Sequence, residues 1–410
     1  MFTINQLNNK FNLSDSDKNQ MENVYRALSY SFSGPLDTED FKNLEMEHFT
    51  DVRGSSQFFY LTAANGDVAS VTEVVPRKGN QKDSLNLLVS MVFTNPQYRK
   101  QGLIGKLISW IITYYETGDI NSDPSLLISD SIKNPYCKEY IDMIIPQIYR
   151  TTKKIHWSLY SIIGDFYKQF GFVGCDNINW LEIKSNEIAK HAEFQINDKS
   201  EKFLKYEDLN EYYFNNNYNF PEIIDENLLN CSLEESSHPG FIERIQSYVK
   251  THQDEISNKE FFQNCGFLIK DELNPKFQTL VFICPFFFIN RIIVNRVFTS
   301  CPDVEMFSKH WERVVQFIYK YAETTWSYLK CLDEVKADDK IIMISDNDFI
   351  SVGGVINKQQ FTDVVVNKYS SWSNKGVGIV LPMIRDWQEH KVKEGKPSSM
   401  LAYNGHWSFM

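Results

Sequence analysis

The chain has 410 residues, of which 42% are hydrophobic and 23% are charged, with 42 Lys and Arg against 53 Asp and Glu. This composition excludes wholesale disorder, and the length suffices to bury a sizeable core in two or three domains. The net charge of −11 disfavours non-specific binding to nucleic acids or to anionic membranes. No apolar run approaches the roughly 18 residues that a membrane helix needs. We therefore expect neither a nucleic acid nor a membrane as partner.

Seven cysteines are spread along the chain without a C-x-x-C pair. This number and spacing are typical of neither a disulfide framework nor a zinc site, so we expect reduced thiols and no metal. The first residues lack the apolar core of a secretory signal. We expect a cytoplasmic protein, with access to the nucleus left open, and the sequence leaves the oligomeric state undetermined.

The N-terminal half predicts alternating helices and strands. Apolar residues at helical spacing predict an amphipathic helix over 15–31, and Asp37 is a candidate cap for a second helix. Asn65-Gly66 between two apolar runs predicts a β-hairpin. The apolar run 86–94 predicts a strand, and residues 104–115 continue at helical spacing. A strand, a tight loop and a long helix therefore follow one another.

A polar interruption over 117–152 predicts an insertion, with a short helix near 140–149. Beyond the insertion we expect a strand at 157–161, a short helix at 165–170 and a single strand within 173–185. These elements would complete an N-terminal domain over 1–190.

The range 191–265 is weakly patterned, and we interpret it as a connector without a core of its own. Order returns with two strands within 277–298, a helix through 307–322 and a strand at 340–345. No internal repeat is visible. The sequence predicts an α/β protein of mixed α+β type, in which the connector is followed by a C-terminal α+β domain over 266–410.

The loop between the apolar strand and the long helix carries positive charge in an otherwise acidic chain. Arg99, Lys100 and Lys106 surround Gly102. The first turn of a helix leaves backbone N–H groups unpaired, the helix dipole adds positive potential there, and glycine allows a ligand to approach the backbone. The loop therefore predicts a pyrophosphate site, with a basic turn that binds nothing as the alternative. The spacing matches neither G-x-x-x-x-G-K-[ST] nor G-x-G-x-x-G.

This loop resembles motif A of the GNAT superfamily of acetyl-CoA-dependent N-acetyltransferases, in which a Tyr-Arg pair and [RQ]-x-x-G-x-[GA] open a long helix. Arg99 and Gly102 occupy the first two key positions, Ile104 stands at the third, and Gly105 follows. The resemblance implies a GNAT-like domain with a central mixed sheet flanked by helices, and acetyl-CoA as co-substrate. The implied cofactor-binding residues are Val92, Phe93, Thr94, Arg99, Lys100, Gln101, Gly102, Leu103, Ile104, Gly105 and Lys106.

A second segment, Phe166 to Phe172, resembles the later signature of the same superfamily, apolar-Tyr-x-x-apolar-Gly-Phe. The resemblance implies that Tyr167 is catalytic, lies near the cofactor sulfur and protonates the leaving thiolate. The alternative is a core aromatic residue whose hydroxyl is satisfied.

Three further segments resemble the fungal lysine N6-acetyltransferase family, which pairs a GNAT-like N-terminal domain with a C-terminal domain of its own. They are Leu159–Tyr167, Leu381–Trp387 and Ala402–Trp407. This resemblance implies that the acceptor is a small amine, the N6 amine of free L-lysine. A protein amine as acceptor and a catalytically silent GNAT-like binding or regulatory protein remain alternatives.

Acetyl transfer to an amine needs a neutral nucleophile, a polarised thioester and a proton for the departing thiolate. Only a small fraction of a lysine side chain, with a pKa of about 10.4, is neutral at pH 7, so the site must deprotonate it. The strand 86–94 carries no carboxylate, and we interpret Glu73 as a solvated strand residue outside the site. A backbone N–H within 91–93 is the candidate donor to the thioester oxygen, and the same strand end can pair with the amides of the pantetheine arm.

Overall fold

The computed structural model divides the chain into two compact units, described here one at a time. The first unit comprises Met1–Cys175, Asp225–Gly240 and Ile379–Ala402, and the second comprises Asp176–Ile224, Phe241–Gly378 and Tyr403–Met410. Within these units the structure describes residues 1–8, 14–33, 36–51, 56–78, 84–132, 154–161, 163–174, 180–184, 194–205, 208, 228–230, 264–286, 291–329, 340–369, 373–374, 381–386 and 400–402.

The first unit is built on a mixed sheet whose strands lie in the order β5-β1-β2-β3-β4-β6-β17-β7. All neighbours are antiparallel except β1 with β5 and β4 with β6, which are parallel. The strands are β1 (Phe2–Asn8), β2 (Gln57–Thr62), β3 (Val68–Lys78), β4 (Ser84–Thr94), β5 (Leu126–Ile128), β6 (Lys154–Ser161), β7 (Val173–Gly174) and β17 (Leu381–Asp386).

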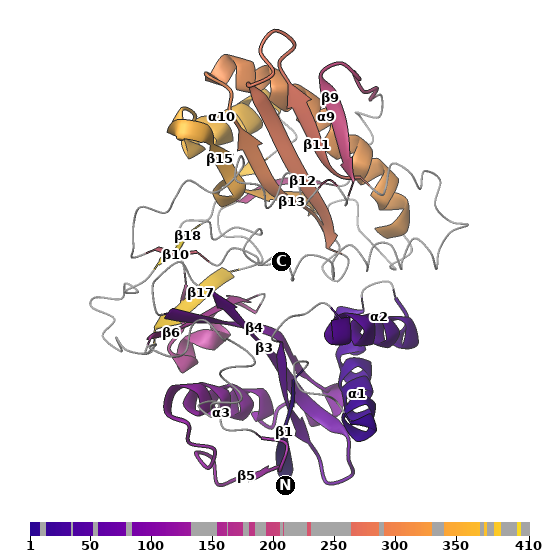
Figure 1. The fold of residues 1–410 in the computed structure, drawn as a ribbon, viewed down its shortest axis with the longest axis vertical. Coiled ribbons are helices and arrows are strands. Elements are labelled where there is room, and N and C mark those ends of the chain that lie inside the picture. Colours follow the sequence, from indigo (N-terminus) through magenta and orange to yellow (C-terminus); the bar gives the residue numbers. More distant parts are fainter. Residues whose placement is uncertain are drawn as a thin grey trace. The chain divides into compact units, whose positions relative to one another are not determined.

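Helices cover both faces of this sheet (Figure 1). Successive residues of a strand point to opposite faces. Phe58 therefore meets Tyr25 of α1 at a ring-centroid distance of 5.6 Å, whereas its neighbour Phe59 meets Tyr114 of α3 at 5.4 Å. The helical segments are α1 (Asp15–Phe32), α2 (Thr38–Asp51), η1 (Pro96–Tyr98), α3 (Leu103–Thr117) and η2 (Gly164–Phe170).

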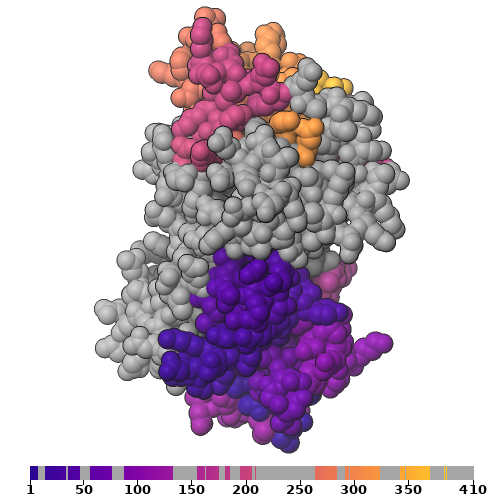
Figure 2. All heavy atoms as spheres, turned by 90° about the vertical axis from the view of Figure 1, so that its right-hand side faces the viewer, coloured from indigo at the N-terminus to yellow at the C-terminus, as the bar shows by residue number. Residues whose placement is uncertain are grey.

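The helices α1 and α2 bury one side and expose the other. Met21, Val24 and Leu28 of α1 are fully buried at helical spacing, as the sequence predicts for an amphipathic helix. Asn23 and Asn43 lie on exposed positions of the two helices. Their outer surface belongs to the indigo face in Figure 2.

The second unit is built on another mixed sheet, in the order β16-β8-β14-β13-β12-β11-β9, with β15 paired to β13. The strands are β8 (Trp180–Lys184), β9 (Glu201–Lys205), β11 (Asn264–Lys270), β12 (Gln278–Phe286), β13 (Arg291–Thr299), β14 (Lys340–Ser345), β15 (Phe349–Ser351) and β16 (Ser373–Asn374). Its helical segments are α9 (Val304–Leu329), η7 (Asp346–Asp348), η8 (Val352–Gly354) and α10 (Lys358–Lys368). Elsewhere in the chain, β10 (Leu228–Asn230) and β18 (Met400–Ala402) form a parallel pair.

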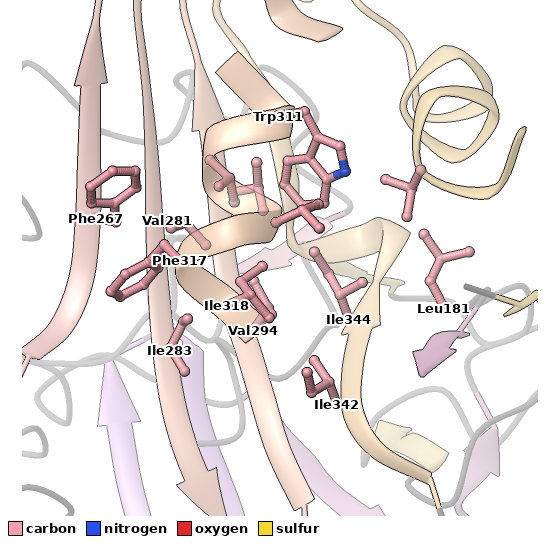
Figure 3. Packing of buried hydrophobic residues seen from close by; sticks show 14 of the residues in the cluster. Leu181, Phe267, Val281, Ile283, Val294, Trp311, Phe317, Ile318, Ile342 and Ile344 are labelled. Carbon is pink, nitrogen blue, oxygen red and sulfur yellow. The ribbon is translucent and has the colours of Figure 1, made fainter. Parts of the chain in front are cut away.

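The core of the second unit lies between this sheet and α9 (Figure 3). The rings of Phe267 and Phe317 stack at 4.9 Å, and Trp311 is fully buried. Leu181 of β8 is also fully buried in this cluster, close to Ile344 in the view of Figure 3. The strand β8 is therefore part of the second hydrophobic core.

The two sheets exchange strands. The strand β7 lies in the first sheet, but the next strand of the chain, β8, pairs with β14 and β16 in the second. Conversely, β16 lies in the second sheet, but the next strand, β17, pairs with β6 and β7 in the first. The second sheet thus includes β8, which follows β7 of the first sheet in the chain. The first sheet includes β17, which follows β16 of the second sheet.

The two sheets repeat one pattern of pairing. From β1 to β7 the first sheet has three antiparallel contacts, one parallel contact and two antiparallel contacts. From β9 to β16 the second sheet has the same series. In both, the strand before a long helix, α3 or α9, makes the parallel contact with a later strand: β14 directly follows α9, whereas β5 comes between α3 and β6.

The sequence predictions of an α/β fold of mixed type and of most elements are confirmed. The helix at 15–31, the Asn65-Gly66 hairpin, the strand at 86–94 followed by the helix at 104–115, and the helix through 307–322 are present. The short helix expected near 140–149 lies outside the described residues.

Three expectations need correction. The single strand within 173–185 is two strands, β7 and β8, which belong to different sheets. The connector 191–265 contains β9, whose Phe203 packs against the second core and whose Leu204 is fully buried. The sequence does not reveal this strand, because five residues are too few for an alternating pattern to stand out. The sequence shows no internal repeat, because the repeat lies in the order of strand pairing and no run of residues recurs.

The strand exchange makes the second unit dependent on β8. We expect Leu181→Ala to lower the free energy of unfolding by about 2–5 kcal/mol, because it leaves a cavity in the core. The matched control is Leu273→Ala, at a side chain that is 96% exposed in the same unit. Urea unfolding followed by tryptophan fluorescence measures both. Equal stability of the two variants would contradict the placement of β8.

Candidate active site

The strand β4 loses its parallel neighbour before it ends. Its pairing with β6 stops at Val89 and Leu159 among the described residues, whereas β4 continues to Thr94. On the other side the β3–β4 register shifts between Val71 and Glu73, and Met91 at this shift has a φ of 45°. A bulge of this kind bends and twists a strand. Among the described residues, Val92 to Thr94 therefore have no strand neighbour on the β6 side, beside the start of α3.

The loop from β4 to α3 is fixed by its own contacts. The Tyr98 hydroxyl donates to Asp67 Oδ2 at 2.8 Å, and Arg99 Nε donates to the Thr94 carbonyl at 3.2 Å. Lys100 adopts a left-handed conformation with φ 65°. Tyr98 therefore positions the loop through the β2–β3 turn and does not face a ligand.

The start of α3 has open backbone donors. Its N-cap is Gly102, with φ 71° and no side-chain cap, and the first intrahelical bond runs from Lys106 N to the Gly102 carbonyl at 3.1 Å. By contrast, Ser14 caps α1 and Asn357 caps α10 through their side chains. The N–H groups of residues 103–105 are thus available to an anion.

Positive side chains flank these donors. Arg99 and Lys100 are exposed, and the Arg99 guanidinium lies 5.8 Å from the centre of the Tyr30 ring. Lys106 Nζ donates to Ser125 Oγ at 2.9 Å, and Gln101 is exposed beside Gly102. The structure thus brings the predicted loop residues together at one helix end.

The apolar residues of the first turn face the core. Leu103 is 3% exposed, and Ile104 packs against the same cluster. Gly105 lies against η2, since a Cβ there would stand 3.6 Å from Phe170 Cζ. Ile104, which replaces the small residue of the motif, therefore directs its side chain into packing.

Tyr167 lies in η2 and is 6% exposed. Its ring packs edge-on against Phe166 and Phe172, and the described residues offer its hydroxyl no hydrogen-bond partner. Burial raises the pKa of the Tyr167 hydroxyl well above its usual value of 10. The group therefore stays protonated at neutral pH and could serve as a proton donor, not as a base.

A buried ion pair joins β17 to the end of α3. Arg385 of β17 donates to both carboxylate oxygens of Glu116, at 3.0 and 2.9 Å, and Trp157 Nε1 donates to Glu116 Oε1 at 3.2 Å. A Cβ at Gly171 would collide with Arg385 Nη1, so only glycine is accommodated there. The sequence did not identify Glu116, whose only signal is its carboxylate at the end of an apolar helix.

Glu73 corrects a sequence interpretation. It is 2% exposed and accepts a hydrogen bond from Ser56 Oγ, whereas a solvated strand residue was expected. In register it lies opposite Ser90, next to the bulge of β4. The reason is that α1 and α2 cover this face of the sheet, which strand alternation alone cannot show.

Within the described ranges, no group of three or more His, Cys, Asp or Glu side chains is placed to hold a metal ion. In the same ranges, no helix has the length and apolar character to cross a bilayer. Residues 403–407 of the C-terminal aromatic segment lie outside the described residues.

We expect Arg385→Met to destabilise the chain by about 3–5 kcal/mol, because it leaves Glu116 buried without its cation. Lys168→Met is the control, since Lys168 and Asp165 form an exposed pair whose loss costs less than about 1 kcal/mol. Adding Glu116→Gln to Arg385→Met is expected to recover part of the stability. Urea unfolding of the four proteins measures this, and similar losses for Arg385→Met and Lys168→Met would contradict it.

No protein-family model and no curated protein matches the chain. Among solved structures, it is similar to a GCN5-related N-acetyltransferase from Kribbella flavida, at 10% identity and a TM-score of 0.42, over 93% of this chain and 71% of that chain. It is also similar to a tandem GNAT protein from the clavulanic acid biosynthesis pathway, at 7% identity and a TM-score of 0.41, over 94% and 99%. A third is a probable N-acyltransferase of unknown function from Enterococcus faecalis V583, at 10% and 0.41, over 94% and 72%.

Proposed function

We propose that the first unit binds acetyl-CoA and transfers its acetyl group to an amine. The observation that carries this proposal is the open edge of β4 beside an uncapped, glycine-initiated helix. An extended amide-containing arm can add to a strand edge, and a pyrophosphate can occupy a helix N-terminus. These two features lie at the two ends of one loop, Asn95 to Gly102.

The residues present suit this ligand. The N–H groups of residues 103–105 donate to no capping side chain, and Arg99, Lys100 and Lys106 supply positive charge in a chain of net charge −11. The backbone of Val92 to Thr94 would hold the pantetheine arm. Gln101, Leu103, Ile104 and Gly105 would contribute through their backbone, since Leu103 and Ile104 pack on the core side and Gly105 has no side chain.

When bound, acetyl-CoA supplies the acyl group as an activated thioester. A backbone N–H within 91–93 would polarise the acyl oxygen, because a donor preorganised at a bulge needs no reorganisation. The neutral amine nitrogen forms the new bond to the acyl carbon, the carbon–sulfur bond breaks, and the nitrogen releases one proton to solvent. Tyr167 Oη, which its raised pKa keeps protonated before the reaction, gives its proton to the departing sulfur and is then reprotonated from solvent.

The acceptor that we propose is a small amine, with free L-lysine as the first candidate. Support comes from the resemblance of two segments to the fungal lysine N6-acetyltransferase family. These segments, Leu159–Tyr167 and Leu381–Trp387, overlap β6 and β17, which pair side by side from Leu381↔Ser161 to Asp386↔His156. A protein amine as acceptor is distinguished by mass spectrometry of free lysine beside a protein panel.

We expect acetyl-CoA to stabilise the chain against heat, and Gly102→Asp to abolish this effect. Ligand at 100 times its Kd stabilises by about 2.7 kcal/mol, which raises the Tm by several degrees. Aspartate at the N-cap would occupy the helix donors and repel the pyrophosphate.

Gly102→Asn is the matched control, because asparagine has the same shape, tolerates a positive φ and lacks the charge. We expect it to retain at least part of the shift. An unshifted wild type, under conditions in which a known acetyltransferase responds, would contradict the proposal and favour the silent-protein alternative.

Tyr167→Phe is expected to lower kcat by about 100-fold or more with little change in KM, since only the proton donor is lost. The Tm should stay nearly constant because the hydroxyl has no partner among the described residues. Tyr60→Phe serves as the control for a buried tyrosine distant from the reaction. Steady-state kinetics with acetyl-CoA and lysine measure both, and an unchanged kcat would remove Tyr167 from the catalytic residues.

A further inference from the structure

We infer that the second unit is a copy of the first whose cofactor groove is closed by its own chain, so that each chain binds one acyl-CoA, at the first unit. This inference rests on the proposed function of the first unit. It concerns the end of β13, which corresponds in the second sheet to the open end of β4 in the first.

The two units also correspond in the position of a register shift, which lies in β4 of the first unit and in β13 of the second. In the first unit, the β3–β4 register shifts between Val71 and Glu73. In the second, the β12–β13 register shifts between Phe282 and Ile283, again with an extra residue on the strand before the long helix. In both units the parallel contact of that strand ends close to this shift, at Val89 and at Val294. The groove-forming geometry is therefore repeated.

In the second unit a strand lies where the first has an open edge. Beyond its contact with β14, β13 pairs in parallel with β15, through Val297↔Phe349, Phe298↔Ile350 and Thr299↔Ser351. In the first unit the corresponding end of β4, Val92 to Thr94, has no such strand among the described residues. The chain thus already makes the edge contacts that a pantetheine arm would need.

The strand β15 is anchored in the second core. Phe349 is 5% exposed, and its ring stacks on Phe361 of α10 at 4.3 Å with an interplanar angle of 12°. It also contacts Phe307 of α9 at 5.4 Å. Displacing β15 would expose this aromatic cluster, so a ligand cannot simply replace it.

The helix end is closed as well. Asp303 caps α9, since Met306 N donates to Asp303 Oδ1 at 2.8 Å and Phe307 N donates to the Asp303 carbonyl at 3.2 Å. Gly102 holds the same position in α3. The Asp303 carboxylate occupies one of the free helix donors, and its negative charge repels a phosphate.

The loop before α9 is short and internally bonded. Cys301 N donates to Thr299 Oγ1 at 3.2 Å, and His310 Nδ1 lies 3.1 Å from Thr279 Oγ1 and 3.4 Å from Cys301 Sγ. Burial raises the pKa of the Cys301 thiol and lowers that of His310, so both groups are neutral. The basic residues of the first loop have no counterpart within Ser300–Asp303.

Titration calorimetry with acetyl-CoA on the full chain tests the inference. We expect one molecule per chain, loss of all binding in Gly102→Asp, and unchanged stoichiometry in Asp303→Asn. Two molecules per chain, or binding that survives Gly102→Asp with its stoichiometry intact, would overturn it.

Hydrogen exchange separates this inference from the proposed function. In the free protein, amides 297–299 should exchange as slowly as the paired amides of β12, and Phe349→Ala should speed their exchange. With acetyl-CoA, exchange should slow over 92–106 and stay unchanged over 297–306. Absence of any binding would refute the proposed function, and the free-protein rates would still decide this inference, since fast exchange at 297–299 overturns it.

Discussion

The fold depends on strands that cross between the two parts of the chain: β17 completes the first sheet, and β8 belongs to the second. The contact between Arg385 and Glu116 spans 269 residues and fixes β17 against α3 and β6. A buried ion pair is costly to desolvate, so it is retained only where the geometry satisfies both partners. Here the carboxylate receives donors from both Arg385 and Trp157. The pair defines one register for β17 and leaves room only for glycine at position 171.

Two local features of the backbone shape the candidate active site. A bulge in β4 separates its end from β6, and a glycine N-cap leaves the first turn of α3 without a side-chain partner. Neither feature needs a charged cluster or a metal. Tyr167 then joins the site through packing, because η2 lies against the start of α3 where Phe170 meets Gly105.

Much of the first unit follows from its sequence. Helical spacing locates α1 and α3, Asn65-Gly66 locates the hairpin, and Gly102 with its basic neighbours locates the loop. These signals come from residues that are close together in the sequence, and interactions among the same residues form the elements. The sheet to which a strand belongs is not fixed by local sequence, because β8 and β17 carry apolar residues that suit either core. No pattern within WLEIK or LPMIRD states which sheet each one completes.

The same limit applies to burial and to the repeat. Glu73 stands in an ordinary strand context, and only the cover provided by α1 and α2 makes it a buried carboxylate. The two units share pairing order while their loops before the long helix differ in length and charge. A search for similar residues therefore finds no repeat, although hydrogen-bond pairing shows one plainly.

The position of β17 also has a consequence for synthesis on the ribosome. Domains usually fold in turn as they emerge, at about 5–20 residues per second. Here β6 ends at Ser161, but its neighbour begins only at Leu381, so the nascent first sheet keeps an open edge for roughly ten to forty seconds. An exposed strand edge invites pairing with other chains. A premature stop before Leu381 would therefore remove a strand from the sheet that was made first.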